Sequence, residues 1–281
     1  MNLSENIKLF SLVVPVYKQE KTIIKNIGQL QKFMDKLGIP YEIIVVVDGI
    51  IDKTYDRAKK IHDKNIKIFG YSKNLGKGNA VKFGMLKAKG DVIGFIDSGM
   101  DLDTNGIEIL LNYMIFHNAD IIIGSKLHPD SIVEYPFQRR LLSTGYRTIT
   151  QLLFGFKVRD TQVGLKIFKK KVVKDVFPKL VVKRFAFDIE LLAVSYARGY
   201  HKIYEAPVKL RFNWGSSISS TFSPSFWQII FSMLWDTLAV YYRLKFLHHY
   251  DRKIKGEEKK LNKSFTIIKK RKNYIMKKYL L

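Results

Sequence analysis

The stretch GDVIGFIDSGMDLD, residues 90–103, is a short apolar run that ends in three carboxylates. Its apolar half predicts a buried strand, and Asp97, Asp101 and Asp103 follow at the carboxyl end of that strand. In open α/β sheets, ligands bind at this end of the strands. Three acids this close repel one another. The stretch therefore predicts either a divalent cation that holds a diphosphate or a solvated acidic loop that caps the next helix.

Strand and helix signals alternate on both sides of this stretch. β-Branched runs at 9–17 and 42–48 predict strands before it, and a strand at 119–125 is expected after it. Continuous apolar strands separated by helices predict an α/β fold, a mostly parallel Rossmann-like sheet with helices on both faces. The other expected elements are helices at 21–37, 54–63, 79–89, 105–118, 141–155 and 187–199 and strands at 67–72, 160–168 and 203–212.

Length and charge narrow the possible classes of protein. The 281 residues suffice for one large α/β domain with an appendage, and the absence of cysteine excludes disulfides and thiolate chemistry. The N-terminus has neither the charge nor the apolar length of a secretory signal. The net charge is +24, and residues 243–281 carry 14 Lys and Arg against 3 Asp and Glu. Such a basic tail suits nucleic acid, anionic lipid or water.

Residues 224–247 predict a separate helix with an unusually wide apolar face. Ser223 and Pro224 are good helix-start residues, and a single polar stripe runs along the segment. Asp236 and Arg243 argue against an ordinary transmembrane span. The pattern favours a helix that lies in a membrane interface and is followed by a polybasic segment, which binds an anionic membrane surface. The alternative is a helix packed against the domain or in a dimer.

Five motifs follow one another along the chain: PVYKQE (15–20), VVVDG (45–49), NLGKGNAVKFG (74–84), the acidic stretch at 97–103 and RDTQVGLKIF (159–168). Their order resembles that of a known family, the GT-A nucleotide-sugar glycosyltransferases of the family 2 type. The resemblance is to the inverting members that act on polyprenyl phosphates such as dolichyl phosphate, and it covers roughly residues 9–217.

This resemblance implies an enzyme that moves glucose or mannose from a UDP- or GDP-sugar to a polyprenyl phosphate, with Mg²⁺ or Mn²⁺ as cofactor. It implies a GT-A domain over 1–221. The apolar and charge patterns add an amphipathic interfacial helix over 222–250 and a polybasic tail over 251–281. We expect a peripheral or monotopic protein on the cytoplasmic face of a membrane, because nucleotide sugars are cytoplasmic and the tail is positive.

The donor is expected at the ends of the first strands. Pro15 keeps the loop rigid and Tyr17 can stack on a base, whereas Asp48 can accept hydrogen bonds from a base or a ribose. Gln19 stands where the family usually has an acid, and Lys77 lies in the glycine-spaced segment that follows. Each has a plainer reading as packing, helix cap or turn.

The metal motif departs from the family pattern. Asp97-Ser98-Gly99 replaces Asp-x-Asp, so position 99 supplies no ligand. In the family a residue two positions further on also supports the cation, and that position is Asp101 here. We therefore expect Asp97 and Asp101 to hold the metal, with Asp97 catalytic and Ser98 in the donor site.

The acceptor phosphate is expected to meet cations beyond the acidic loop, because Arg and Lys bind phosphates through charge-assisted hydrogen bonds. The candidates are Lys126, Arg139, Arg140 and Arg159, whose plainer reading is a solvated basic face. Asp160 matches the family's acid in Asp-x-x-x-Gly and is expected to orient the reaction as a catalytic residue.

Two residues near the end of the family resemblance complete the expected donor site. Arg211 and Ser217 resemble residues of a loop that closes over the donor.

A GT-A transferase that acts on a hydroxyl acceptor of a polysaccharide or protein is the alternative enzyme. It would need Asp160 or Asp188 as a true base. A basic nucleic-acid-binding protein is the alternative from another class. The acids in the expected cleft oppose it, so we predict no nucleic-acid partner.

Overall fold

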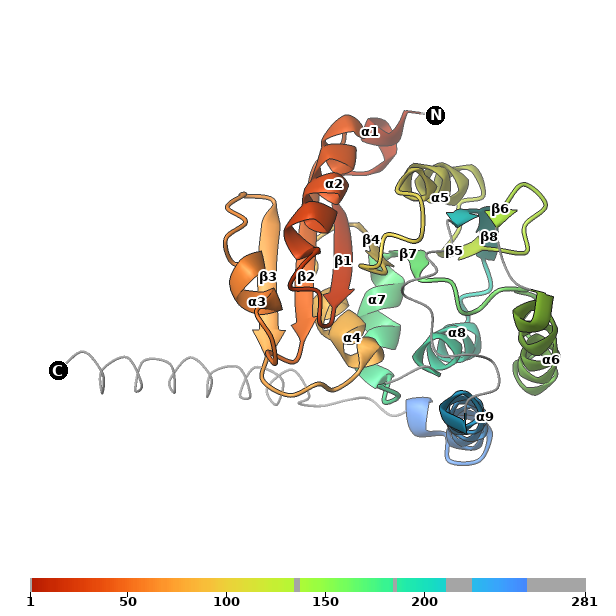
Figure 1. The fold of residues 1–281 in the computed structure, drawn as a ribbon. Coiled ribbons are helices and arrows are strands. Elements are labelled where there is room, and N and C mark those ends of the chain that lie inside the picture. The colour runs from red at the N-terminus through yellow and green to blue at the C-terminus, as the bar shows by residue number, and fades with distance from the viewer. Residues whose placement is uncertain (1, 134–136, 184–185, 211–223, 252–281) are drawn as a thin grey trace.

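The computed structural model describes residues 2–133, 137–183, 186–210 and 224–251. Its centre is a seven-stranded sheet in the order β3-β2-β1-β4-β7-β5-β8, beside a two-stranded sheet of β6 and β9 (Figure 1). The strands are β1 (Phe10–Val16), β2 (Tyr41–Asp48), β3 (Ile66–Tyr71), β4 (Val92–Ile96), β5 (Ile121–Ser125), β6 (Ile132–Val133), β7 (Leu165–Lys169), β8 (Ile203–Pro207) and β9 (Lys209–Leu210).

Helices cover both faces of the large sheet, as the continuous apolar strands predict. Alternate residues of β1 show why both faces are covered: Val14 packs into the core on one side and Val13 into the core on the other. One core includes α1 (Leu3–Asn6), α2 (Ile23–Lys36), α3 (Thr54–Ala58) and α5 (Asn105–Phe116), and the other includes α4 (Lys77–Lys87), α6 (Phe137–Phe154), α7 (Lys170–Val176), α8 (Phe187–Ala197) and α9 (Pro224–Lys245).

The predicted α/β class is confirmed, but several expected elements differ in their bounds. The strand expected at 203–212 is divided between β8 and β9, which belong to different sheets. The expected strand at 160–168 begins only at Leu165. Residues 160–164 form a loop because the carboxylate of Asp160 accepts hydrogen bonds from two backbone amides, those of Lys126 and Gln162. The expected helix at 54–63 ends at Ala58.

The sheet directions bring distant segments to one edge. β1 runs parallel to β2 and β4, while β7 is antiparallel to both β4 and β5. The start of β7 therefore lies beside the ends of β4 and β5, and Ile96 is paired with Leu165. Every loop that follows β1, β2, β4 or β5, and the loop that precedes β7, emerges at this carboxyl edge.

The C-terminal part adds helices outside the sheet. α9 packs against α6 and α8, and the short turn η2 (His249–Asp251) follows it (Figure 1). A second 3₁₀ turn, η1 (Phe177–Lys179), follows α7. Tyr250 is buried, and its hydroxyl donates to Glu190 on α8 over 2.6 Å. The described chain therefore ends firmly attached to the domain.

Candidate active site

Asp97 lies at the carboxyl edge, where a backbone hydrogen bond holds its main chain and a glycine leaves room for its side chain. Its backbone N–H donates to the carbonyl of Gly164 over 2.9 Å. A Cβ at Gly164 would lie 1.9 Å from Oδ2 of Asp97, so only glycine fits there. The glycine of the Asp-x-x-x-Gly motif thus lets the Asp97 carboxylate lie directly against the start of β7.

Lys77, the first residue of α4, holds this carboxylate from the other side. Its Nζ lies 2.7 Å from Oδ1 and 2.9 Å from Oδ2 of Asp97. The two side chains stay 37% and 45% exposed, so the pair is open to a ligand. Burial opposes the ammonium charge, but the carboxylates of Asp97 and Asp188 prevail and raise the pKa of Lys77.

Asp101 fits the role of second metal ligand and Asp103 does not. A Cβ at Gly99 would lie 3.2 Å from Oδ2 of Asp101, so this carboxylate reaches the space that a residue-99 side chain would fill. Burial and the charge of Asp97 raise the pKa of Asp101. Asp103 instead accepts a hydrogen bond from the N–H of Asn105 at the start of α5. Of the three acids in this stretch, Asp103 is therefore the one whose carboxylate caps the next helix.

Two carboxylates suit a hard divalent cation that takes its other ligands from a diphosphate and water. Among the described residues, no three His, Cys, Asp or Glu side chains gather as a complete metal site. Four buried side-chain atoms lack hydrogen-bond partners within the described chain, and two of them belong to segments of this edge: Oε1 of Gln19, whose Nε2 contacts Ser98, and Nε2 of Gln162 in the loop before β7. The other two are Oδ1 of Asn112 and Oγ of Ser195. Such orphaned atoms need a partner, and a bound ligand can supply one. The residues present fit a cation with its diphosphate.

The segment after β1 contacts the acidic loop directly. Gln19 donates from Nε2 to the hydroxyl of Ser98 over 2.8 Å, and Asn26 donates to the carbonyl of Ser98 over 2.9 Å. Pro15 is a buried residue of β1, and Tyr17 follows it with 42% exposure. The position taken by the family's acid is thus occupied by an amide that supports Ser98.

Asp48 is turned toward the protein itself. It is buried at the end of β2, and its two oxygens accept hydrogen bonds from the N–H groups of Leu75 and Gly76 at 2.8 and 2.9 Å. These bonds hold the segment that leads into α4 and Lys77. A contact between Asp48 and a donor stays a prediction.

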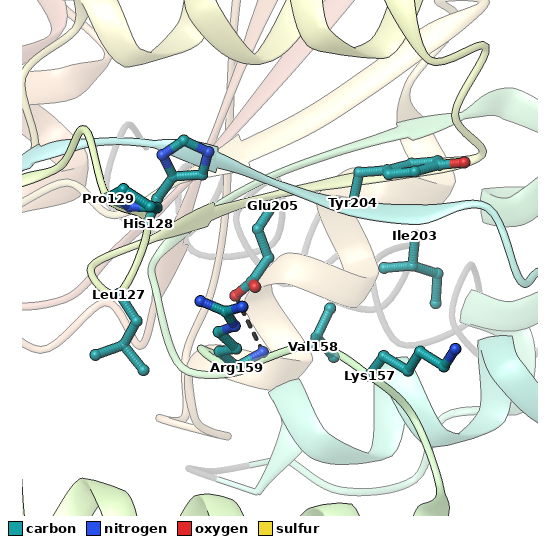
Figure 2. A pocket seen from close by; sticks show the side chains of 9 residues that line it. All are labelled: Leu127, His128, Pro129, Lys157, Val158, Arg159, Ile203, Tyr204 and Glu205. Atoms are coloured by element: carbon teal, nitrogen blue, oxygen red, sulfur yellow. Dashed lines mark hydrogen bonds between the residues drawn. The ribbon is translucent and has the colours of Figure 1, made fainter.

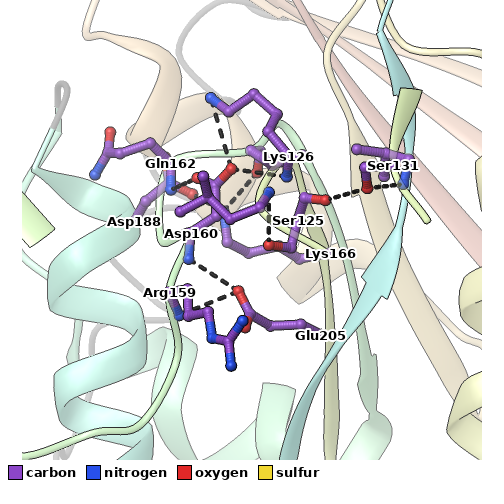
Figure 3. A network of polar contacts seen from close by, with 12 residues as sticks. Ser125, Lys126, Ser131, Arg159, Asp160, Gln162, Lys166, Asp188 and Glu205 are labelled. Atoms are coloured by element: carbon purple, nitrogen blue, oxygen red, sulfur yellow. Dashed lines mark hydrogen bonds and ion pairs between the residues drawn. The ribbon is translucent and has the colours of Figure 1, made fainter. Parts of the chain in front are cut away.

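Asp160, in the loop before β7, meets Lys126, in the loop after β5 (Figure 3). The Asp160 carboxylate accepts from the backbone N–H of Lys126 over 2.9 Å, and the Lys126 ammonium lies 3.7 Å away. Asp160 is only 6% exposed. Its own N–H donates to Glu205 over 2.9 Å, which ties the loop to β8. Asp160 therefore acts as a structural anchor for Lys126 in this arrangement.

A buried ion pair that the sequence reasoning missed lies beneath this loop. Lys166 on β7 is fully buried and pairs with Asp188 on α8 (Figure 3). Burial lowers the pKa of Lys166 although Asp188 opposes the shift. Lys166 also donates to the carbonyl of Val163 over 2.6 Å, which fixes the loop next to Gly164. A charged residue inside the apolar run LKIF was the available signal, because a buried lysine needs a partner.

Arg159 does not share the surroundings of Lys126. Its side chain lines a pocket of about 350 Å³ between the 126–131 loop and β8 (Figure 2). Lys157, His128 and Tyr204 also line this pocket, and neither Asp97 nor Asp160 does. The four candidate phosphate ligands are therefore not shown to converge. Arg139 and Arg140 belong to α6, and Arg211 and Ser217 lie outside the described residues.

Comparisons with known proteins agree with this geometry. The chain is 32% identical over 201 residues to a dolichyl-phosphate beta-glucosyltransferase of Drosophila melanogaster, covering 66% of this chain and 62% of that protein. The corresponding protein of Dictyostelium discoideum is 30% identical over 209 residues, with 69% and 64% covered. The chain thus spans less than two thirds of the length of these two relatives.

Solved structures share the fold. Glucosyl-3-phosphoglycerate synthase from Mycobacterium tuberculosis, in complex with Mn²⁺, UDP and phosphoglyceric acid, superposes with a TM-score of 0.62. It is 18% identical, and the match covers 89% of this chain and 81% of that one. A family model for glycosyl transferase family 2 matches residues 11–177, from β1 to η1 and across the edge with Asp48, Asp97 and Asp160. The chain belongs to glycosyl transferase family 2.

Proposed function

We propose that the protein is an inverting glucosyltransferase that moves glucose from UDP-glucose to a polyprenyl phosphate of the dolichyl type. The names of the relatives support glucose and a dolichyl phosphate acceptor. UDP in the related solved structure supports a uridine donor over a guanosine donor. The observation that carries the proposal is the arrangement at the carboxyl edge, where the Asp97 side chain is open to solvent and the buried Asp160 carboxylate holds Lys126.

The donor side would be formed by the loops after β1, β2 and β4. Asp97 and Asp101 would hold Mg²⁺ or Mn²⁺, which neutralises the charge that develops on the leaving diphosphate. Tyr17 is exposed beside this edge and can stack on the base. Gln19 and Ser98, already hydrogen-bonded to each other, would keep the acidic loop in place while the donor binds.

The acceptor phosphate would approach from the side of Asp160 and Lys126. One of its oxygens attacks the anomeric carbon as the bond from that carbon to the diphosphate breaks, so the configuration inverts. A phosphate monoester is largely dianionic near neutral pH, since its second pKa is about 6. The nucleophile therefore needs no general base, and Asp160 positions Lys126 instead.

The hydroxyl-acceptor alternative is less well supported. It requires a carboxylate that can take a proton, and both candidates are occupied. Asp160 accepts two backbone hydrogen bonds, and Asp188 is paired with the buried Lys166. A carboxylate that acts as a base here would have to take the proton while it holds these partners.

The apolar face of α9 supports a role at a membrane surface. Thr237 and Val240 are buried against the domain. On the rest of the helix and just beyond it, large apolar side chains are exposed: Phe231 66%, Trp235 74%, Leu238 51%, Tyr242 54% and Phe246 66%. We place this face in the interface of a membrane, on its cytoplasmic side, with the basic tail against anionic lipid.

Within the described residues, none of the helices has the length and apolarity needed to cross a membrane. Packing against the domain accounts for the buried side of α9, where Thr237 meets Tyr146 over 2.8 Å, but not for its aromatic face. A dimer would also cover that face, so the dimer alternative stays open.

A donor matrix tests this function. Purified protein receives dolichyl phosphate with UDP-glucose, UDP-galactose, GDP-glucose or GDP-mannose, each with Mn²⁺ and with excess EDTA, and lipid-extractable sugar is measured. We expect product from UDP-glucose with Mn²⁺ only. Mannose transfer from GDP-mannose would overturn the choice of sugar, and full activity in EDTA would overturn the metal assignment.

A further inference from the structure

Lys77 is paired with the carboxylate of Asp97, which a metal ion would also use. Its ammonium contacts both oxygens of Asp97, at 2.7 and 2.9 Å, so it sits on the edge of the carboxylate that a cation would approach. The hydrogen bond from the Asp97 N–H to the Gly164 carbonyl holds the main chain of Asp97, and the missing Cβ of Gly164 leaves the space in which the carboxylate lies. A cation that binds Asp97 must therefore share it with Lys77 or displace the ammonium.

The backbone of Lys77 is held while its side chain can move. The next residue, Gly78, donates from its N–H to the carbonyl of Lys183 over 2.9 Å. A Cβ at Gly78 would lie 2.6 Å from Cβ of Phe187, so the start of α4 is packed tightly against α8. The side chain of Lys77 is 37% exposed and has several rotatable bonds. Exchange of partners therefore requires only a rotamer change.

A displaced ammonium needs another anion nearby. Asp188 is close enough to favour the charge of Lys77, but its own carboxylate is already paired with the buried Lys166. The diphosphate of a donor brings the missing negative charge to the same place. Lys77 can then exchange Asp97 for a phosphate oxygen without leaving any charge unpaired.

We propose that Lys77 is a resident cation that couples the metal to the nucleotide. It holds Asp97 in the donor-free protein and competes with the metal ion. When a nucleoside diphosphate binds, the ammonium moves to the phosphate and the metal takes the carboxylate. Metal alone then binds weakly, and metal and nucleotide tighten each other. This inference rests on the proposed nucleotide-sugar function.

The test is a binding cycle by isothermal titration calorimetry with the full chain, using MnCl₂ and UDP separately and together. For the wild type we expect UDP to tighten Mn²⁺ binding by about 10-fold or more, within the usual range of coupling between two ligands. In Lys77→Met, Mn²⁺ alone should bind several-fold tighter and UDP alone weaker. The coupling should be several-fold smaller than in the wild type, because only the direct contact between the cation and the diphosphate then remains.

Two further variants make the result specific. Lys73→Met removes a charge from the same segment at an exposed position and should keep the wild-type coupling, which separates competition from a general field effect. Lys77→Arg keeps the charge and should retain most of the coupling. Thermal melting confirms folding, and Lys77→Gln replaces Lys77→Met if the latter does not fold.

The outcomes separate this inference from the proposed function. Unchanged coupling in Lys77→Met, or Mn²⁺ binding no tighter than in the wild type, would refute the competition. Failure of the wild type to bind UDP or any other nucleoside diphosphate would instead refute the nucleotide-sugar function itself.

Discussion

The two acids at the carboxyl edge have opposite surroundings. On the donor side, Asp97 is 45% exposed in its side chain and is neutralised by one movable lysine. On the acceptor side, Asp160 is 6% exposed and is saturated by backbone amides and Lys126. An open carboxylate can change partners during a reaction, whereas a saturated one maintains the shape of a loop. The comparison assigns chemistry to the donor side and positioning to the acceptor side.

The largest effect is expected at the open carboxylates. Asp97→Ala should lower donor turnover by about 10³-fold or more, because charge on the leaving group is no longer offset. Asp101→Ala should be nearly as harmful, since Gly99 supplies no ligand. Release of UDP from UDP-glucose measures both.

Asp103→Ala is the matched control for this pair. Asp103 is an acid of the same loop, but its carboxylate accepts from Asn105 at the start of α5, so turnover should change less than 3-fold, with about 1 kcal/mol of stability lost. Gly99→Asp should restore part of the activity of Asp101→Ala. Wild-type Mn²⁺ affinity in Asp101→Ala would contradict the assignment of Asp101 as a ligand.

The second effect concerns the acceptor cations on α6. Replacing Arg139 and Arg140 together with alanine should raise the acceptor KM by about 10²–10⁴-fold and leave the donor KM nearly unchanged. The reason is that each charge-assisted hydrogen bond to a phosphate contributes about 1.5–3 kcal/mol. Initial rates with dolichyl phosphate varied at saturating UDP-glucose measure this. A parallel rise of the donor and acceptor KM values would contradict the prediction that these arginines bind the acceptor phosphate alone.

A third, intermediate effect is expected for membrane binding. Phe231→Ser with Trp235→Ser should weaken binding to neutral liposomes by about 10-fold or more, because two exposed aromatic side chains no longer insert. Flotation measures the bound fraction. Phe116→Ser, which is 70% exposed on α5, is the control and should bind normally.

The tail is tested separately by a chain that ends after Asp251. This cut keeps Tyr250 and its buried bond to Glu190, so the domain should stay folded. Binding to anionic liposomes should fall, since each cation near such a surface contributes about 1 kcal/mol, while binding to neutral liposomes should not change. Equal loss on both kinds of liposome would contradict the separation of apolar and electrostatic contributions.

The smallest effect is expected at the saturated acid. Asp160→Asn should keep activity within about 10-fold of the wild type, because the amide oxygen can still accept from the N–H of Lys126 and no proton has to be abstracted. A general base, by contrast, contributes about 10²–10⁴-fold. A loss of that size in kcat, measured at saturating substrates, would show that Asp160 acts as a general base and not as a positioning residue.

The sequence predicted the ends of β2 and β4 better than the loop before β7 for a physical reason. β1, β2 and β4 are continuous apolar runs, so Asp48 and Asp97 could be placed at the same edge of the sheet from periodicity and the parallel-sheet rule. The contact between Lys77 and Asp97 could not, because it depends on where α4 begins relative to β4. Single polar residues such as Glu205 carry no motif at all.

On the acceptor side the sheet itself changes direction. β7 runs antiparallel between β4 and β5, which the order of strand and helix signals does not reveal. This reversal brings Asp160 to the edge with Lys126, yet leaves the side chain of Arg159 in the pocket beside β8. Neighbours in sequence thus face different surroundings, and the family motif alone did not separate them.

The most direct test of the account is transfer of labelled glucose from UDP-glucose to a short polyprenyl phosphate compared with the matching polyprenol. Because Asp160 and Asp188 already hold other partners, we expect efficient transfer to the phosphate, retained in Asp160→Asn, and no transfer to the alcohol. Comparable transfer to the polyprenol, abolished in Asp160→Asn, would contradict the claim that the acceptor brings its own charge and needs no base.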